Sequence, residues 1–430
     1  MVNKYKWVVA LFCLTACGDV NLPPVGVETD LNKIPLPENN TESLMEIPLK
    51  PETEPMLHKG ALHTQDDFDR VKENAEKDPW KTGLEILRTN RHAQLEYVPN
   101  PQESIKRGVS GDENYSIAMN DVAAAYQLGL RFRLGDGDAY GDKVIEILGG
   151  WADKCTLVTG NTNMALAFGL YGYEFAVAGE QIRDYWLKKD PIGFAAYQQW
   201  MVNVFYPGSH DFFVNHFGTP ADHYWANWGL CNVASMMAVG ILADRRDIYN
   251  EAVEHFQVGE TNGRMTEAII HVFDGEHAHF AQWQESGRDA GHVLLCQGLM
   301  GTICQLTWNQ GDDFFGYQDN LYLKACEYNG CYFVAEQNVP FHPYTREYKG
   351  NWGVAVDELN FIAERTGNKG GPIWALAYNH YAKIKGVDAS KCKYTKMGME
   401  VCFPEGGGGN YGSNSGGFDH LGFGTLMYSR

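Results

Sequence analysis

The chain has 430 residues, with 54 acidic side chains against 35 basic ones and a net charge of −19. This charge excludes a general nucleic-acid-binding surface, because such a surface needs basic residues to neutralise phosphates. The length is sufficient for one large domain or two ordinary ones.

The N-terminus has the pattern of a bacterial lipoprotein signal. Two lysines in residues 1–6 precede an apolar run, 7–15, that is too short to remain in a membrane, and small residues then lead to Cys17. We expect residues 1–17 to be a signal peptide ending in a lipidated cysteine. The protein would then be lipid-anchored in the bacterial periplasm or on the outer membrane, with no other membrane attachment.

The next segment, residues 18–55, has the composition of a flexible stalk. It is rich in Pro, Glu, Asn and Asp and poor in aromatic residues, so it cannot bury a core of its own. No second linker follows. We therefore expect residues 56–430 to form one domain.

The body of the chain is predicted to be helical. Apolar residues recur at helical spacing over lengths too great for ordinary strands, and short Gly, Asp, Asn and Pro runs separate the stretches. Successive helices joined by short loops form antiparallel hairpins, and a ring of hairpins buries one face of each helix. The sequence thus predicts an all-α fold, an (α/α) toroid. The stretches are 115–134, 140–153, 163–187, 225–242, 290–310, 314–333 and 373–385.

One helix start in this series carries two amide side chains. Asn161 and Asn163 precede a stretch that continues through Tyr171 and Glu174. Helix capping explains at least one of these asparagines, and the other is a candidate for substrate binding.

A second helix start combines groups that suit acid–base chemistry. After Asp222, the residues His223 and Tyr224 offer a proton acceptor and a phenol donor, and Asn227 is an uncharged carboxylate binder beside Trp228. An aromatic helix start capped by Asp222 would have the same sequence.

The richest cluster is Gln284-Glu285-Ser286-Gly287-Arg288-Asp289-Ala290-Gly291-His292. If this segment is helical, Gln284, Arg288 and His292 share one face, with Glu285 and Asp289 beside them. Arg288 would hold a carboxylate while His292 moves a proton. A buried charge network that fixes a helix is the alternative, and the nine residues alone do not decide between the two.

Metal and disulfide chemistry have weaker support. Asp274, Glu276 and three histidines lie within 271–279, but His277 and His279 are two residues apart and would diverge on a helix. We expect no metal site and no required cofactor, and nothing supports a structural or charge-neutralising divalent cation. Local disulfides could join Cys326 to Cys331 or Cys392 to Cys402, although spacing alone does not show it.

Taken together, the motifs resemble the alginate lyase superfamily from about Leu62 to Arg430. The motifs are residues 284–292, Tyr224-Trp225-Ala226-Asn227-Trp228, Asp244-Arg245-Arg246-Asp247 and Phe418-Asp419-His420-Leu421-Gly422-Phe423-Gly424-Thr425-Leu426. The resemblance implies an (α/α) toroid that cleaves uronic-acid polysaccharides, such as alginate or glucuronan, by β-elimination.

The chain departs from the best-known branch of that superfamily at two places. That branch has Asn-Asn-His a short way before its Tyr-Trp pair, whereas Pro220-Ala221-Asp222-His223 directly precedes Tyr224 here. It also has a tyrosine after an arginine where this chain has His292. The roles of His223, Tyr224 and His292 are therefore exchangeable at this point.

We expect a polysaccharide lyase that acts as a monomer on an anionic polysaccharide, with polymannuronate preferred. The C5 proton of a uronate is weakly acidic while the carboxylate is charged, so a lyase must neutralise that carboxylate. The expected catalytic residues are His223, Tyr224, Arg288 and His292. The expected substrate-binding residues are Asn161, Asn163, Asn227, Trp228, Gln284 and Glu285.

Two other functions remain open. A glycoside hydrolase on the same toroid would use two carboxylates, for which Glu285, Asp289, Asp222 and Glu174 are available. A non-catalytic surface glycan-binding lipoprotein would rely on aromatic side chains. The sequence gives neither the uronate nor the linkage nor endo or exo action, and a site elsewhere would involve Asn163, His279, Tyr344 or Arg346.

Overall fold

The computed structural model describes residues 46–350, 353–406 and 419–430, all within the unit formed by residues 35–430. The expected signal peptide, Cys17 and most of the expected stalk lie outside the described residues. In the part of the chain that is described, no helix combines the length and apolar character needed to cross a membrane.

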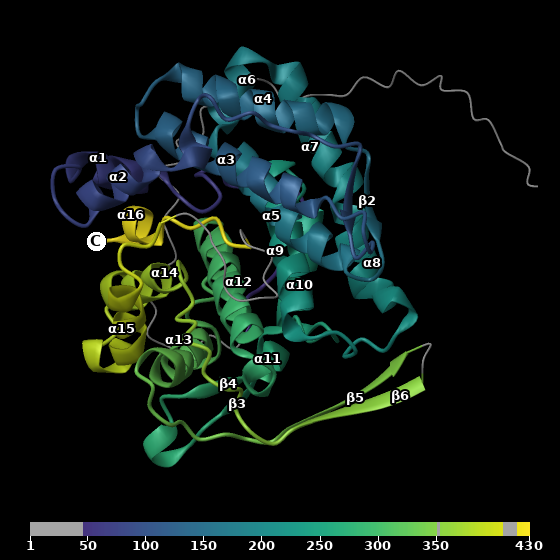
Figure 1. Cartoon of the computed structure of the whole chain (residues 1–430), viewed down its shortest axis with the longest axis vertical. Coiled ribbons are helices and arrows are strands. Elements are labelled where there is room, and N and C mark those ends of the chain that lie inside the picture. The colour runs from purple at the N-terminus through teal and green to yellow at the C-terminus, as the bar shows by residue number, and fades with distance from the viewer. Residues whose placement is uncertain (1–45, 351–352, 407–418) are drawn as a thin grey trace, which may run out of the picture. The chain divides into compact units, whose positions relative to one another are not determined.

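Four long helices with mostly buried side chains form the inner wall of the fold (Figure 1). Because they are surrounded by other helices, they are apolar on all sides rather than along one stripe. These helices are α3 (Tyr115–Arg133), α5 (Met164–Gln181), α9 (Ala226–Leu242) and α12 (Ala290–Asn309).

The inner helices α5 and α9 run in the same direction. Near their starts, Asn232 Nδ2 donates to the carbonyl of Ala165 (3.1 Å). Past their ends, Arg183 donates to the carbonyl of Leu242 (2.8 Å). Two glycines of α5 allow the close contact, since a Cβ added to Gly169 would lie 2.3 Å from the sulfur of Cys231 and one added to Gly172 would lie 2.1 Å from Ser235 Oγ.

An outer helix returns along each of three inner helices. α4 (Asp138–Lys154) packs on α3, α10 (Arg246–Val258) on α9, and α13 (Tyr317–Asn329) on α12. The outer helices bury one face only; in α10 this face consists of Ile248, Tyr249, Ala252, Val253 and Phe256. This arrangement of hairpins confirms the predicted (α/α) toroid.

The other helices complete the ring and its connections. They are α1 (Gln65–Glu73), α2 (Trp80–Thr89), α6 (Arg183–Lys189), α7 (Pro191–Val204), α8 (Tyr206–Asn215), α11 (Met265–Ala268), α14 (Trp374–Asn379), α15 (Lys393–Val401) and α16 (Gly424–Tyr428), with π-helical turns at Gly330–Val334 and His380–Ile384. α16 packs against α1 and α2 at the other end of the chain (Figure 1). Arg70 of α1 fixes this contact by donating to the carbonyls of Met427 (2.6 Å) and Ser429 (2.9 Å).

Three predicted helices are interrupted. The stretch 163–187 breaks at Ile182, whose φ and ψ are −114° and 14°, so that α5 and α6 are separate. The stretch 314–333 begins with three left-handed residues, 318–320, and ends in a π-helical turn. The stretch 373–385 likewise ends in a π-helical turn. Hydrophobic periodicity does not register such local changes of winding.

Three two-stranded sheets depart from the all-α expectation. β1 (Ser104–Arg107) pairs in parallel with β2 (Leu157–Gly160), and β3 (Ile269–Val272) pairs antiparallel with β4 (Ala281–Trp283). β5 (Tyr344–Gly350) and β6 (Gly353–Leu359) form an antiparallel hairpin in which Tyr344 faces Leu359.

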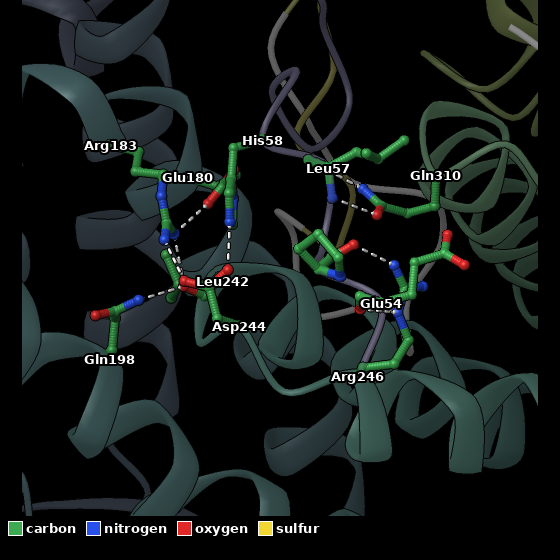
Figure 2. Close-up of polar contacts among 11 residues, drawn as sticks. Glu54, Leu57, His58, Glu180, Arg183, Gln198, Leu242, Asp244, Arg246 and Gln310 are labelled. Carbon is green, nitrogen blue, oxygen red and sulfur yellow. Dashed lines mark hydrogen bonds and ion pairs between the residues drawn. The ribbon is translucent and has the colours of Figure 1, made fainter. Parts of the chain in front are cut away.

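Residues 46–63 form an N-terminal strap across the helix ends. The side-chain amides of Gln257 and Gln310 each pair with both backbone groups of one strap residue, Ile47 and Leu57 respectively, at 2.6–2.9 Å. Arg246 donates to the carbonyls of Glu54 and Pro55 (Figure 2). Residues 46–55 are therefore bound to the body rather than part of a free stalk. The composition of this segment does not predict its attachment, because the attachment comes from hydrogen bonds between helix side chains and the strap backbone and not from an apolar core.

His58 joins the strap to two acidic side chains (Figure 2). Its Nδ1 lies 2.8 Å from Glu180 Oε1 and its Nε2 lies 2.5 Å from Asp244 Oδ1. Burial opposes a charge on the ring, but the carboxylates of Glu180 and Asp244 outweigh it and raise the pKa of His58 to about 9.

We expect His58→Gln to destabilise the protein in a pH-dependent way. Because the pKa of His58 is higher in the folded state than the unfolded value of 6.5, the stabilisation is complete below pH 6.5 and disappears as the pH rises through about 9. The loss in unfolding free energy should be roughly 1–3 kcal/mol at pH 6 and near zero at pH 10. Denaturant unfolding at both pH values, with His210→Gln as a more exposed ion-paired control, measures it. An equal loss at both pH values would contradict this account.

Candidate functional site

The two sequence clusters meet at the start of α9. Trp225 is the N-cap residue of α9 and cannot cap it with its side chain. Instead, the backbone N–H of Ala226 donates to Gln284 Oε1 (2.8 Å) and that of Asn227 donates to Glu285 Oε1 (2.9 Å). These bonds satisfy helix N–H groups that would otherwise lack partners. Gln284 and Glu285 thus position the site rather than lying open to substrate.

Glu285 also fixes Arg288. The carboxylate of Glu285 is fully buried, and its second oxygen accepts a hydrogen bond from Arg288 Nη1 at 2.8 Å. The Arg288 side chain is 26% exposed, so part of its guanidinium remains accessible. The ring of Trp225 lies under this group, with the Arg288 Cζ 4.9 Å from its centroid.

Residues 284–292 do not form one helix. Gln284–Gly287 is a short 3₁₀ helix, Asp289 is extended with φ −169° and ψ 161°, and α12 begins at Ala290. The expected common face of Gln284, Arg288 and His292 is therefore wrong. The break arises because Asp289 caps α12 by accepting the backbone N–H of His292 at 2.8 Å.

Asp289 also orients the imidazole of His292. Its Oδ2 lies 2.6 Å from His292 Nδ1. Burial works against a charge on Asp289, but the hydrogen bonds from His292 and the charge of Arg288 hold its pKa below the usual value. An ionised carboxylate only accepts hydrogen bonds, so Nδ1 carries the proton and Nε2 of the neutral ring keeps its lone pair.

Tyr224 and His223 lie at the same helix start. The Tyr224 ring stacks on Trp228 with centroids 4.7 Å apart and meets the edge of His223 at 4.6 Å. Burial raises the pKa of Tyr224, and the hydroxyls of Thr162 and Thr219 counter this only in part. Burial and the charge of Arg346 lower the pKa of His223. Near neutral pH, Tyr224 is therefore a protonated phenol and His223 is a neutral imidazole.

The amide of Asn227 faces into the same buried region. Its side chain is 1% exposed, and its Oδ1 accepts no hydrogen bond from the described residues. Asp222, by contrast, is exposed and does not cap α9. The capping role that the sequence offered for Asp222 is taken by Gln284 and Glu285.

Asn161 and Asn163 shape the loop that leads into α5. Asn161 Oδ1 accepts the backbone N–H of Asn163 (2.9 Å), and its amide packs on Gly108, where an added Cβ would lie 1.9 Å from Oδ1. The intervening residue, Thr162, is the one that influences Tyr224. The contacts of Asn161 are thus structural, and the substrate-binding role expected for the two asparagines stays a prediction.

The hairpin β5–β6 reaches the site at its base. Arg346 donates to the carbonyl of His223 and to Asp357 Oδ2 (2.7 Å), and its Cζ lies 3.8 Å from the Trp225 centroid. Gln284 Nε2 donates to the hydroxyl of Tyr344 at 3.0 Å. Sequence reasoning named Tyr344 and Arg346 only as a separate fallback site, because no spacing links them to residues some 60 to 120 positions away.

The buried carboxyl group of Asp419 interacts electrostatically with His292. Asp419, from the closing segment of the chain, lies within electrostatic range of His292 and of Arg107 on β1. Glu174 of α5 is fully buried and lies within range of both Asp419 and Arg107. The sequence marked Asp419 as part of a motif without giving it a role.

The histidine-rich segment lies apart from these groups. His271 stacks on His342 with centroids 4.1 Å apart, and among the described residues no set of three or more His, Cys, Asp and Glu side chains could hold a metal ion. His279 lines a cavity of about 620 Å³ with Lys324 and Lys385, which shares no lining residue with the site. The described cysteines are free thiols, so the two local disulfides considered from spacing are not formed.

Comparisons with known proteins agree with this architecture. An alginate lyase from Bacteroides ovatus is 12% identical, with a TM-score of 0.54 over 86% of this chain and 99% of that chain. The apo form of a variant of alginate lyase A1-III is also 12% identical, with a TM-score of 0.53 over 87% and 96%. These likenesses show a common fold. No curated protein sequence matches significantly.

The sequence itself matches a family model. The model, described as alginate lyase, covers residues 64–327, which is more than half of the chain and includes both clusters of the site up to His292. This match supports a polysaccharide lyase. The chain belongs to the alginate lyase family.

Proposed function

We propose that the protein cleaves a uronic-acid polymer, alginate ahead of glucuronan, by β-elimination. The observation that carries this proposal is the arrangement around Asp289. Its Oδ2 binds His292 Nδ1 at 2.6 Å and lies 3.9 Å from Arg288 Nε, which brings a proton acceptor and a carboxylate-binding cation together. The family match, and the alginate lyases that share the fold, favour alginate.

Arg288 and Asn227 would bind the substrate carboxylate. A guanidinium has five N–H donors, and the bond to Glu285 leaves others available. Neutralising the carboxylate stabilises the enolate-like state that forms when the C5 proton leaves.

His292 is the proposed base and Tyr224 the proposed acid. His292 Nε2 takes the C5 proton, the electrons of that C–H bond form the C4–C5 double bond, and O4 leaves with the electrons of the C4–O4 bond and takes the phenol proton. Tyr224 suits this task because burial keeps its proton in place. His223 would position the Tyr224 ring, on whose edge it packs.

The glycoside hydrolase alternative has less support from the carboxylates. Glu285 is fully buried and already accepts hydrogen bonds from Asn227, Arg288 and Cys296. Asp289 is bound to His292, Glu174 is fully buried, and of the four candidates only Asp222 is exposed. Two accessible carboxylates flanking a glycosidic bond would be required.

We expect the purified protein to generate unsaturated products from polymannuronate, polyguluronate or glucuronan, with the two alginate blocks ahead of glucuronan. The new C4–C5 double bond is conjugated with the carboxylate and absorbs in the near ultraviolet, whereas hydrolysis creates no such chromophore. Absorbance is followed with each polymer in turn. Folded protein that gives no absorbance gain on any of them rules out the lyase proposal.

Single substitutions should separate a catalytic cluster from a structural one. We expect at least two of Arg288→Ala, His292→Ala, His223→Ala and Tyr224→Phe to lower kcat/KM by roughly a hundredfold or more, the scale of positioned acid–base groups. Initial rates are compared after thermal unfolding shows an unchanged midpoint.

Two ion-paired residues provide matched controls, Arg245 at the N-cap of α10 and His210 on α8. Arg245 pairs with Asp247, and His210 pairs with Glu251. Their alanine variants should keep near-normal rates, because exposed ion pairs contribute only about 0–1 kcal/mol. If all four site variants behave like these controls, the cluster is structural and the catalytic site lies elsewhere, around Asn163, His279, Tyr344 or Arg346.

A further inference from the structure

The closing segment of the chain enters the interior of the toroid at Asp419. The hydroxyl of Tyr173 on α5 donates to the Asp419 carbonyl at 2.7 Å. The next residue, His420, packs on α12 where Gly298 leaves room, since a Cβ there would lie 2.2 Å from the His420 ring. The segment is thus held between α5 and α12, the helix that carries His292.

The carboxyl group of Asp419 has no ordinary structural role. The residue is 1% exposed, and neither carboxylate oxygen accepts a hydrogen bond from the described residues. Three other buried carboxyl groups behave differently. Glu285, Glu327 and Glu405 each accept hydrogen bonds from the first N–H groups of a helix. A buried carboxyl group without such partners calls for another explanation.

Five ionisable groups face Asp419 from the surrounding elements. Only two of them carry positive charge, Arg107 on β1 and His292 on α12 when its ring is protonated. Burial raises the pKa values of the other three groups, Tyr171, Glu174 and Cys231, and so favours their uncharged forms.

Arg107 is a fixed positive charge near this carboxyl group. Its Nη1 donates to the hydroxyl of Tyr171 at 2.9 Å, and its Cζ lies 4.6 Å from the centroid of Tyr115. Burial raises the pKa of Asp419 to about 7, and the charges of Arg107 and His292 limit the rise. Asp419 is therefore ionised above neutrality, whereas burial and the charge of Asp419 hold the pKa of Glu174 well above its usual value.

We propose that Asp419 is a positioning residue of the elimination, whose carboxylate stabilises the positive charge that His292 gains when it accepts the substrate proton. This inference rests on the proposed function. Asp289 binds Nδ1 of the imidazole from the surface side, and Asp419 acts on it from the interior, where the low dielectric strengthens the interaction. The proton stays on His292, and Asp419 changes neither its bonds nor its protonation during the step.

Kinetics of Asp419→Asn test this role. Above about pH 8, kcat of the variant should be roughly tenfold or more below that of the wild type, while KM changes little, because a charge that acts in the transition state is lost. As the pH falls below about 7, wild-type Asp419 becomes protonated and loses the same charge. The ratio of the wild-type rate to the variant rate should therefore fall towards one below about pH 6, with a midpoint near pH 7.

Glu405→Gln is the matched control. Glu405 is another buried carboxyl group, whose pKa burial raises to about 8, and its Oε1 accepts the N–H groups of Trp374 and Ala375. Glutamine keeps that acceptor. The ratio of the wild-type rate to the Glu405→Gln rate should stay near one across the same pH range, because Glu405 has no charge contact with His292.

A carboxyl titration separates this inference from the proposed function. In protein labelled with ¹³C at aspartate carboxyl groups, the Asp419 signal should titrate near pH 7, and at higher pH in His292→Gln, because the positive charge of the protonated His292 ring limits the rise of the Asp419 pKa. Titration near pH 4, no response to His292→Gln, or a rate ratio for Asp419→Asn that is constant with pH would overturn the inference while the lyase activity stands. If the wild-type protein has no lyase activity, both the proposed function and this role are wrong, even if the titration shows that the charges of Asp419 and His292 are coupled.

Discussion

The site depends on two side chains that cap a helix to which they do not belong. Gln284 and Glu285 accept hydrogen bonds from the first N–H groups of α9, and the Glu285 carboxylate also accepts one from Arg288. A helix cap contributes about 1 kcal/mol, but removing one partner of a buried charged group costs roughly 3–5 kcal/mol. The bond network therefore joins the segment around Tyr224 rigidly to the segment that leads into His292.

The same device recurs elsewhere in the toroid. Glu327 of α13 accepts the N–H groups of Tyr394 and Thr395 at the start of α15, and Glu405 accepts those of Trp374 and Ala375 at the start of α14. In each case a buried glutamate from one element fixes where another helix begins. Carboxylates suit helix starts because the helix dipole is positive there. Asp419 does not follow this pattern, which leaves its carboxyl group available for the proposed role.

Hydrophobic periodicity was sufficient to predict the inner helices. The stretches 225–242 and 290–310 differ by no more than one residue at either end from α9 and α12, because a fully buried helix keeps its apolar pattern to its ends. Periodicity missed the left-handed residues 318–320 and the hairpin β5–β6, since these depend on contacts made outside the segment. The spacing of Gln284, Arg288 and His292 suggested a shared helix face, but the cap formed by Asp289 starts a new helix after Arg288.

For the site, residue chemistry predicted the members that are close in sequence and missed those brought in by the fold. The backbone of Ala226 and Asn227 does meet Gln284 and Glu285, and the functional roles of these residues stay predictions. Arg346 and Asp419 approach the same region from a hairpin and from the end of the chain. Nothing in the local pattern of either residue indicates its partner, because these contacts form only when the ring closes.

The central claim is that this assembled site removes a proton and expels an oxygen without consuming water. The mass balance of a single cleavage tests it most directly. A uronate oligomer of defined length is digested, and the two products of each break are weighed by mass spectrometry. The account predicts product masses that add up to the mass of the substrate, with one product carrying the new double bond. A gain of one water per break would contradict it and would indicate hydrolysis.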